Sequence, residues 1–190
     1  MTNPEASRIL IATGKTCSGK TTLTGTLATV YGLQILPAIT TRYPRPSDFP
    51  GEFRHLSEEQ FDALDPTDMM WATEHGSPPA RYTLLRSTVR AAILDTDFQY
   101  TRPLSPSSAE KVMTVFGSGI VKVMYLPTPD ESEIVRRAQQ RGDDLTNVTA
   151  RLANEAGWDE YAAGVPGFHM AEGRTPDELV KEALSLVSPH

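Results

Sequence analysis

The stretch Gly14 to Thr21, GKTCSGKT, constrains the fold of this chain most, because it matches the pattern G-x-x-x-x-G-K-[ST] in full. It follows an apolar run at 8–13, RILIAT, which predicts a buried strand, and it opens an amphipathic run from about Lys20 to Tyr31, which predicts a helix. In this setting, backbone N–H groups and a helix N-terminus wrap a phosphate. The alternative is a glycine-rich turn with an unrelated lysine, flanked by a strand and a helix through coincidence.

This loop predicts a nucleoside triphosphate and Mg²⁺ as ligands. Lys20 is expected to reach the β- and γ-phosphates, and the hydroxyl of Thr21 to coordinate the metal. Cys17 lies inside the loop, either as a passive small residue or as a thiol activated by the helix N-terminus. The residues expected to bind the triphosphate are Gly14, Thr16, Cys17, Ser18, Gly19, Lys20, Thr21 and Thr22.

Length, composition and charge indicate one intracellular domain. A chain of 190 residues suits a single domain, and no run approaches the 18 apolar residues of a membrane span. The net charge of −6 argues against broad binding to nucleic acids or anionic membranes. One cysteine excludes an internal disulfide and favours a reducing compartment, so we expect a cytoplasmic protein without nucleic-acid or membrane partners.

Short apolar runs alternate with amphipathic runs, which is typical of an α/β protein with a parallel sheet and crossover helices. After the helix at 20–31, strands are expected at 33–39, 69–73, 91–96, 120–126 and 167–170. Helices are expected at 57–64, where Ser57 and Gln60 can form a capping box, and at 83–90, 107–116, 129–142, 147–161 and 175–187.

The segment at 40–51, TTRYPRPSDFPG, places two arginines on a proline-stiffened loop. If the loop bends into one turn, the guanidinium groups of Arg42 and Arg45 can close on a single phosphate with little ordering entropy left to lose. From spacing alone, a solvated surface loop is an equal alternative. Arg137 and Arg141 lie four residues apart on an expected helix and therefore share a face, where they either bind phosphate or complement the helix dipole.

The order of these segments resembles that of guanylate kinases. The segment ITTRYPRP…GEFRHLSEEQFD resembles the family's T-T-R-x-P-R and G-x-x-Y-x-F-x-S-x-x-x-F, and ILDTDFQ (93–99) resembles its strand ending in I-D-x-Q-G. MWATEHG…RYT (70–83) resembles the stretch around its Tyr-Gly-Thr, RRAQQRGDD (136–144) resembles its lid helix, and ARLANEA (150–156) resembles the R-L-x-x-A that follows. The resemblance runs in order from about residue 8 to 161.

This resemblance implies a P-loop NTPase-type parallel sheet flanked by helices, with a small acceptor-binding insertion and a helical lid. The core would span about 7–37, 90–130 and 155–190, the acceptor-binding region about 38–89, and the lid about 131–154. ATP would be the phosphoryl donor, with Mg²⁺, and small-molecule nucleotides the ligands of a monomer or homodimer. The implied catalytic residues are Lys20, Arg137, Arg141 and Arg151, and the implied acceptor-binding residues are Arg42, Arg45, Phe53, Met70, Glu74, Tyr82 and Asp97.

Several positions depart from the family pattern. Met70 stands where the resemblance implies an acid that reads guanine N–H donors, so either Glu74 substitutes or the base is not guanine. Phe53 replaces a tyrosine, and Ala38 replaces a serine. Asp95 and Asp97 are expected to divide between Mg²⁺ and the acceptor; the residues alone do not say which does which, and we take Asp95 as the metal ligand.

Three hypotheses follow. The first is an ATP-dependent nucleoside monophosphate kinase that keeps the phosphate chemistry on a different or broader acceptor. The second is a kinase of another phosphorylated small molecule, of the ribose bisphosphate type. The third is a non-catalytic binding module, which the complete phosphate loop disfavours.

Overall fold

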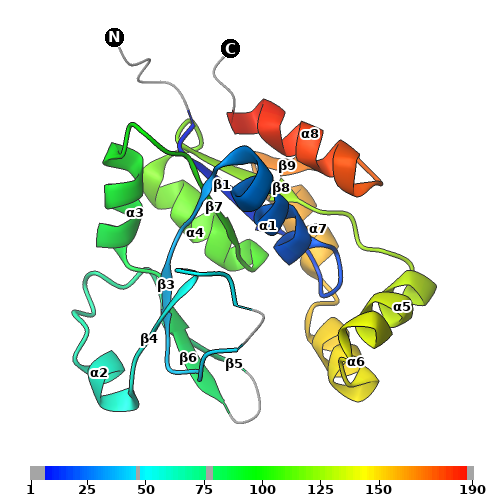
Figure 1. Ribbon diagram of the computed structural model, residues 1–190, viewed down its shortest axis with the longest axis horizontal. Helices are drawn as coiled ribbons and strands as arrows, with labels where there is room; N and C mark the ends of the chain where they lie inside the picture. Colours follow the sequence, from blue (N-terminus) through cyan, green and yellow to red (C-terminus); the bar gives the residue numbers. More distant parts are fainter. Residues whose placement is uncertain (1–6, 46–47, 76–78, 188–190) are drawn as a thin grey trace.

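The computed structural model describes residues 7–45, 48–75 and 79–187, and its centre is a five-stranded parallel sheet (Figure 1). The strand order is β2-β7-β1-β8-β9, with each neighbouring pair parallel. The strands are β1 (Ile9–Thr13), β2 (Gln34–Ile35), β7 (Tyr100–Pro103), β8 (Val121–Tyr125) and β9 (Phe168–Met170). This confirms the α/β class expected from the alternating runs.

Helices cover both faces of this sheet because its central strand is apolar on both sides. On one face of β1, Leu10 packs against α1 (Lys20–Tyr31) and α8 (Pro176–Val187). On the other face, Ile9 and Ile11 pack against α4 (Pro106–Phe116). All three side chains are fully buried. The result is a three-layer arrangement in which the loop after β1 lies at the carboxyl end of the sheet's strands.

A second, four-stranded sheet is inserted between β2 and β7, in the order β4-β3-β6-β5. Its strands are β3 (Ala38–Thr40), β4 (Phe53–His55), β5 (Thr73–His75) and β6 (Ala80–Thr83), accompanied by α2 (Glu58–Asp62) and α3 (Arg86–Leu94). The predicted capping box of α2 is confirmed, since Gln60 N donates to Ser57 Oγ and Ser57 N donates to Gln60 Oε1.

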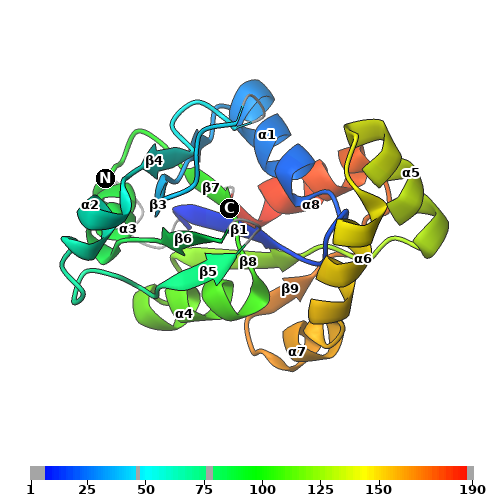
Figure 2. The ribbon, with the colours of Figure 1, turned by 90° about the horizontal axis from the view of Figure 1, so that it is seen from below.

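Two helices, α5 (Glu131–Arg141) and α6 (Leu145–Asn154), lie at the opposite end of the molecule from α2 and α3 (Figure 2). Asp130 caps α5 and Asp144 caps α6, each through its carboxylate. A separate helix, α7 (Trp158–Gly164), then leads to β9. The prediction of a single helix at 147–161 is therefore wrong, because a turn at 155–157 separates α6 from α7.

The strand predicted for 33–39 is two strands in different sheets. β2 pairs with β7 of the main sheet, while β3 pairs with β4 and β6 of the inserted sheet. Leu36 and Pro37 lie between them, and Leu36 is fully buried at the crossing. The strand predicted for 69–73 is also wrong: Met69 forms only an isolated bridge with Leu85, and the strand begins at Thr73.

The most consequential correction concerns 83–96. The expected strand at 91–96 is the second half of α3, and the neighbouring strand of β1 begins only at Tyr100. Asp68 stabilises the start of α3 by accepting hydrogen bonds from Ser87 N and Ser87 Oγ at 2.8 and 2.5 Å. A short apolar run does not distinguish a helix from a strand, and this cap comes from a distant segment.

The packing of α1 against the main sheet predicts a clear stability effect. Leu27 is fully buried among Leu10, Leu23 and Val180, so Leu27→Ala should lower the free energy of unfolding by about 3 kcal/mol. On the same helix Val30 is 68% exposed, and Val30→Ala should change the free energy of unfolding by less than about 0.5 kcal/mol. Urea unfolding of both variants checks this, and equal midpoints would contradict the packing described.

Candidate functional site

A cleft of about 1840 Å³ runs from the loop after β1 to the inserted sheet, with α5 and α6 along its other side. Its described lining includes the loop residues 16–22, together with Arg45, Phe53 and Tyr82 from the inserted region and Arg137, Arg141 and Arg151 from the two helices. The structure thus brings together three segments that the sequence had assigned to phosphate chemistry. In the described part of the chain, no helix is long and apolar enough to span a bilayer.

The conformation of the loop depends on glycines at two positions. Gly14 has φ 141°, and a Cβ there would lie 2.8 Å from Ser18 Oγ and 2.9 Å from the carbonyl oxygen of Leu126. Gly19 has φ 100° at the start of α1, and Cys17 adopts φ 65° although it is not a glycine. A left-handed non-glycine residue is a strained conformation that clusters at ligand sites. Gly14 lies beneath the loop and does not line the cleft.

Lys20 lies inside the loop. Its Nζ donates to the carbonyl oxygens of Gly14 and Lys15, at 2.7 Å each. Burial is the main reason that the pKa of Lys20 falls to about 8, and the nearby carboxylate of Glu155 opposes that shift. An anion bound in the loop would raise the pKa of Lys20 again, because its negative charge stabilises the ammonium form that burial disfavours.

This pKa predicts a pH dependence for triphosphate binding. Above pH 8 the free protein holds a neutral Lys20 and must take up a proton to bind the anion, whose phosphates stay ionised throughout. Affinity for a non-hydrolysable ATP analogue should therefore fall as pH rises, by up to about tenfold per unit above pH 8. Calorimetry at pH 9 in buffers of different ionisation heat should register uptake of close to one proton.

The control for this prediction is Lys20→Met, whose residual binding should not vary with pH over the same range and should take up no proton. Equal affinity of the parent protein at pH 7.5 and pH 9.5 would contradict the assignment of the titration to Lys20.

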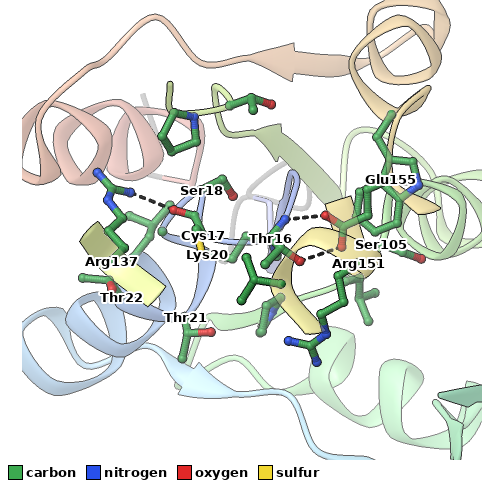
Figure 3. Close-up of a pocket in the computed structure, with 18 of the residues that line it drawn as sticks. Thr16, Cys17, Ser18, Lys20, Thr21, Thr22, Ser105, Arg137, Arg151 and Glu155 are labelled. Atoms are coloured by element: carbon green, nitrogen blue, oxygen red, sulfur yellow. Dashed lines mark hydrogen bonds between the residues drawn. The ribbon is translucent and has the colours of Figure 1, made fainter. Parts of the chain in front are cut away.

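Two carboxylates that the sequence analysis missed hold the phosphate loop. Glu155, directly after α6, accepts from Thr16 N at 2.6 Å and from Thr16 Oγ1 at 2.9 Å (Figure 3). Asp159 on α7 pairs with Lys15 and accepts hydrogen bonds from the hydroxyls of Tyr125 and Thr128, both at 2.8 Å. The segment after α6 is therefore fastened to the loop. No local sequence pattern indicates these contacts, which join residues 139 and 144 positions apart.

Two arginines of α5 contact the same loop. Arg137 donates through Nη1 to the carbonyl oxygen of Cys17 at 2.9 Å (Figure 3), and its Nε donates to Glu133 at 2.6 Å. Arg141 places Nη2 2.8 Å from Cys17 Sγ and 2.7 Å from Asp143. Arg151 lines the cleft from α6 and is exposed. The expected shared face of Arg137 and Arg141 is thus turned toward the phosphate loop.

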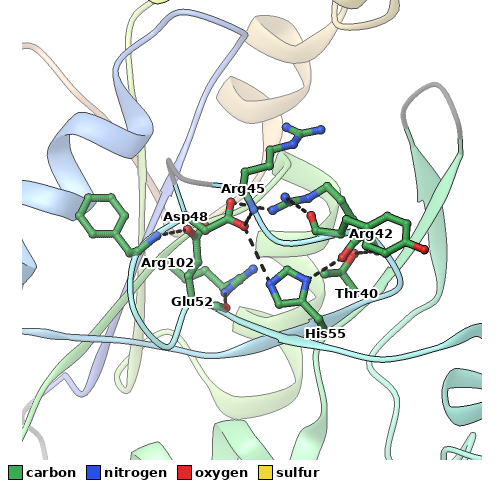
Figure 4. A network of polar contacts seen from close by, with 9 residues as sticks. Thr40, Arg42, Arg45, Asp48, Glu52, His55 and Arg102 are labelled. Atoms are coloured by element: carbon green, nitrogen blue, oxygen red, sulfur yellow. Dashed lines mark hydrogen bonds and ion pairs between the residues drawn. The ribbon is translucent and has the colours of Figure 1, made fainter.

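Arg42 and Arg45 do not converge in this structure (Figure 4). Arg42 donates to Asp48 Oδ1 at 2.8 Å and to the carbonyl oxygen of Tyr43 at 2.9 Å, and it does not line the cleft. Arg45 lines the cleft with an exposed side chain, while its backbone N–H donates to Asp48 Oδ2 at 2.8 Å. Asp48 therefore shapes the loop through both arginines. Residues 46 and 47, including one proline expected to stiffen it, lie outside the described residues.

The remaining acceptor-side predictions divide into two groups. Phe53 and Tyr82 line the cleft, 6.2 Å apart between ring centroids. Met70 is instead buried in the core beneath the inserted sheet, and Glu74 is exposed on β5; neither lines the cleft. Glu74 is therefore not placed to substitute for the acid expected at position 70.

Asp95 and Asp97 lie at the wrong end of the sheet for the roles expected of them. They follow α3 and precede β7, so they lie near the amino ends of the strands, where Tyr100 pairs with Ile9. The phosphate loop lies at the opposite, carboxyl end, where it leaves β1 at Thr13. Asp95 accepts from the hydroxyl of Tyr100 at 2.7 Å and from Asp97 N at 2.9 Å. Asp97 is exposed, Asp95 is half-buried and neither lines the cleft, because the strand beside β1 begins only at Tyr100, after both residues.

A parallel sheet with a phosphate-binding loop after its central strand, an inserted sheet and an arginine-bearing helix pair defines the class of P-loop kinases. The solved guanylate kinase of Anaplasma phagocytophilum has the same fold, with a TM-score of 0.65 over 96% of this chain and 85% of that one, at 16% identity.

Sequence comparison places the chain within that class. It is 30% identical to a guanylate kinase of Nitrobacter winogradskyi over 183 residues, which cover 90% of this chain and 77% of that protein. A guanylate kinase of Nitrobacter hamburgensis is 31% identical over 157 residues, covering 76% of this chain and 68% of that protein. No family model matches the sequence. The chain belongs to the guanylate kinase family.

Proposed function

We propose that this protein transfers the terminal phosphoryl group of ATP to the phosphate of a nucleoside monophosphate and so forms the diphosphate. The observation that carries the proposal is the meeting, in one cleft, of the Lys20 loop, the α5 arginines and Arg45. Two anions must approach in line for phosphoryl transfer, which requires positive charge on both sides of the transferring group. The names of its relatives support ATP as donor and make GMP the first acceptor to test.

In this proposal the chain acts by position and charge. The loop N–H groups and Lys20 hold the donor's β- and γ-phosphates, and Arg45 holds the acceptor phosphate. Arg137, Arg141 and Arg151 neutralise the charge that spreads over the transferring group. No general base is needed, because the acceptor phosphate is already ionised at neutral pH.

The α5–α6 pair is proposed to act as a lid, as part of the division into core, acceptor-binding region and lid predicted from the sequence. In the structure α5 already contacts the phosphate loop through Arg137 and Arg141. A lid excludes water from the transferring phosphoryl group and so limits hydrolysis of ATP.

Magnesium fits this site only in part through protein ligands. The hydroxyl-bearing Thr21 lines the cleft and is exposed, whereas no group of three or more acidic, histidine or cysteine side chains in the described ranges is arranged to hold a metal. We propose that Thr21 and phosphate oxygens together hold the ion, and that Asp95 takes no part. When bound, the ion neutralises charge on the donor phosphates.

The test is whether ADP release depends on an acceptor and on Mg²⁺. With ATP and Mg²⁺ alone, ADP should form slowly; adding GMP or another nucleoside monophosphate should raise the rate by at least about a hundredfold, and chelation should abolish it. ADP release that no acceptor accelerates would refute the kinase and favour simple ATP hydrolysis.

A second candidate function is phosphorylation of a non-nucleotide sugar phosphate. Arg102 on β7 lines the acceptor half of the cleft and favours this candidate, because a second phosphate on the acceptor would pair with it.

A further inference from the structure

Arg102 is a buried arginine whose hydrogen-bonding capacity is incompletely used. It lies on β7, lines the cleft and is only 4% exposed. Its Nη1 donates to the carbonyl oxygens of Leu36 at 2.6 Å and Glu52 at 3.0 Å. Its Nε is buried with no hydrogen-bond partner among the described residues. A desolvated donor left unbonded is unfavourable, so the guanidinium retains capacity for a further hydrogen-bond acceptor.

Arg102 remains a cation at neutral pH. Burial lowers its pKa to about 10, against the opposing influence of Glu52, so the side chain is almost fully protonated at pH 7. Its guanidinium lies 4.8 Å from the centroid of the Phe53 ring, and that of Arg42 lies 5.0 Å from the same centroid. The side chain is therefore held in one place before any ligand arrives.

The surroundings of Arg102 are largely aromatic. Phe53, Trp71 and Tyr82 line this half of the cleft with aromatic surface, whereas Arg45 is exposed. Arg45 is thus accessible to the acceptor's phosphate, and the aromatic side chains with Arg102 are left for the acceptor's head group.

This half of the cleft also lacks an acid in its described lining. The carboxylates that line the cleft come from α5, α6 and the residues flanking them: Asp130, Glu133, Asp143, Asp144 and Glu155. The resemblance placed the strand ending in I-D-x-Q-G at 93–99 and Asp97 at the acceptor, but the strand beside β1 is β7, Tyr-Thr-Arg-Pro, and it is Arg102 that lines the cleft. A head group bound beside these aromatic side chains therefore meets the hydrogen-bond donors of Arg102 rather than a carboxylate.

We propose that Arg102 determines acceptor specificity by donating to an oxygen of the head group, and that the cognate acceptor presents a keto or anionic oxygen there rather than an amino group. The proposal rests on the proposed function for the identity of the bound class. A keto oxygen of a nucleobase and an oxygen of a second phosphate share this chemistry.

Matched pairs of nucleotides test it. IMP and AMP differ by a keto against an amino group on the purine, and UMP and CMP differ in the same way on the pyrimidine; ribose 1,5-bisphosphate tests an anionic oxygen. Binding of each compound is measured by thermal shift with a non-hydrolysable ATP analogue, and transfer is measured with ATP. The parent protein should favour the keto member of a pair, or the bisphosphate over every nucleotide, by about ten- to hundredfold.

Two variants assign the preference to Arg102. Arg102→Met should reduce it to less than about threefold, while ATP-analogue binding is retained as evidence of folding. Arg102→Lys, which keeps the charge without the fork, should give an intermediate ratio. Arg54→Ala, an exposed arginine on β4 outside the cleft lining, should leave the ratio unchanged.

The outcomes separate the two proposals. Equal binding of keto and amino partners, with no preference for the bisphosphate, overturns the role of Arg102. A uniform loss across all acceptors in Arg102→Met also overturns it, since that pattern marks a phosphate contact. Selective binding without transfer to any acceptor supports the role of Arg102 and overturns the proposed function instead.

Discussion

Lys20→Met is expected to lower the rate of phosphoryl transfer by about a thousandfold while leaving the protein folded. The Nζ of Lys20 is held inside the phosphate loop by the carbonyl oxygens of Gly14 and Lys15, at 2.7 Å each. From there it can contact the β- and γ-phosphate oxygens of the donor. Methionine has similar length and no charge, so the variant removes the electrostatic contribution with little change in volume. Stopped or coupled assays of diphosphate formation measure the loss.

Lys181→Met is the matched control. Lys181 is exposed on α8 and does not line the cleft, so this substitution should keep the parent rate within about twofold. A Lys20→Met protein with more than a tenth of the parent activity would show that the loop does not perform the proposed chemistry.

Arg45→Ala is expected to lower kcat/KM for the acceptor by about fiftyfold, with KM for ATP changed by less than about threefold. Hydrogen bonds to charged groups contribute roughly 1.5–3 kcal/mol, and Arg45 is the arginine of the 40–51 loop that lines the cleft. Because the loop is shaped by Asp48 through the backbone N–H of Arg45, truncating the side chain leaves that bond in place. Initial rates with each substrate varied in turn separate the two effects.

Arg54→Ala, on the strand β4 that follows this loop, serves as the control for the loss of one positive charge, and it should leave both kinetic constants near the parent values. If Arg45→Ala raised KM for ATP and for the acceptor equally, Arg45 would contribute general electrostatic attraction rather than a contact with the acceptor phosphate.

Elements with complete local signals were predicted well from the sequence. The strand at β1, the helix α1 and the cap of α2 all depend on residues adjacent in the chain, and the structure confirms them. The helix predicted for 83–90 overlaps the first half of α3, but its second half was predicted as a strand because the short apolar run at 91–96 does not distinguish the two. The change of sheet at Leu36 was missed for a related reason, since both halves of 33–39 are apolar and only their partners differ.

The candidate site follows the same division. The loop residues 16–22 line the cleft as a contiguous segment, as their pattern predicted. Glu155 and Arg102 were not identified, because neither belongs to a local motif and each gains its place through tertiary contacts, with Thr16 in one case and Leu36 and Glu52 in the other. The arginine in Tyr-Thr-Arg-Pro was a signal for a site, because a charged side chain is seldom buried in a sheet without a partner.

Transfer of label from [γ-³²P]ATP tests the central claim most directly. With Mg²⁺ and the acceptor that the thermal-shift comparison selects, the label should appear in the acceptor's diphosphate, with inorganic phosphate well below it, and the transfer should be lost in Lys20→Met. Label released only as inorganic phosphate, or retained in ATP with every nucleoside monophosphate and with ribose 1,5-bisphosphate, would contradict the account.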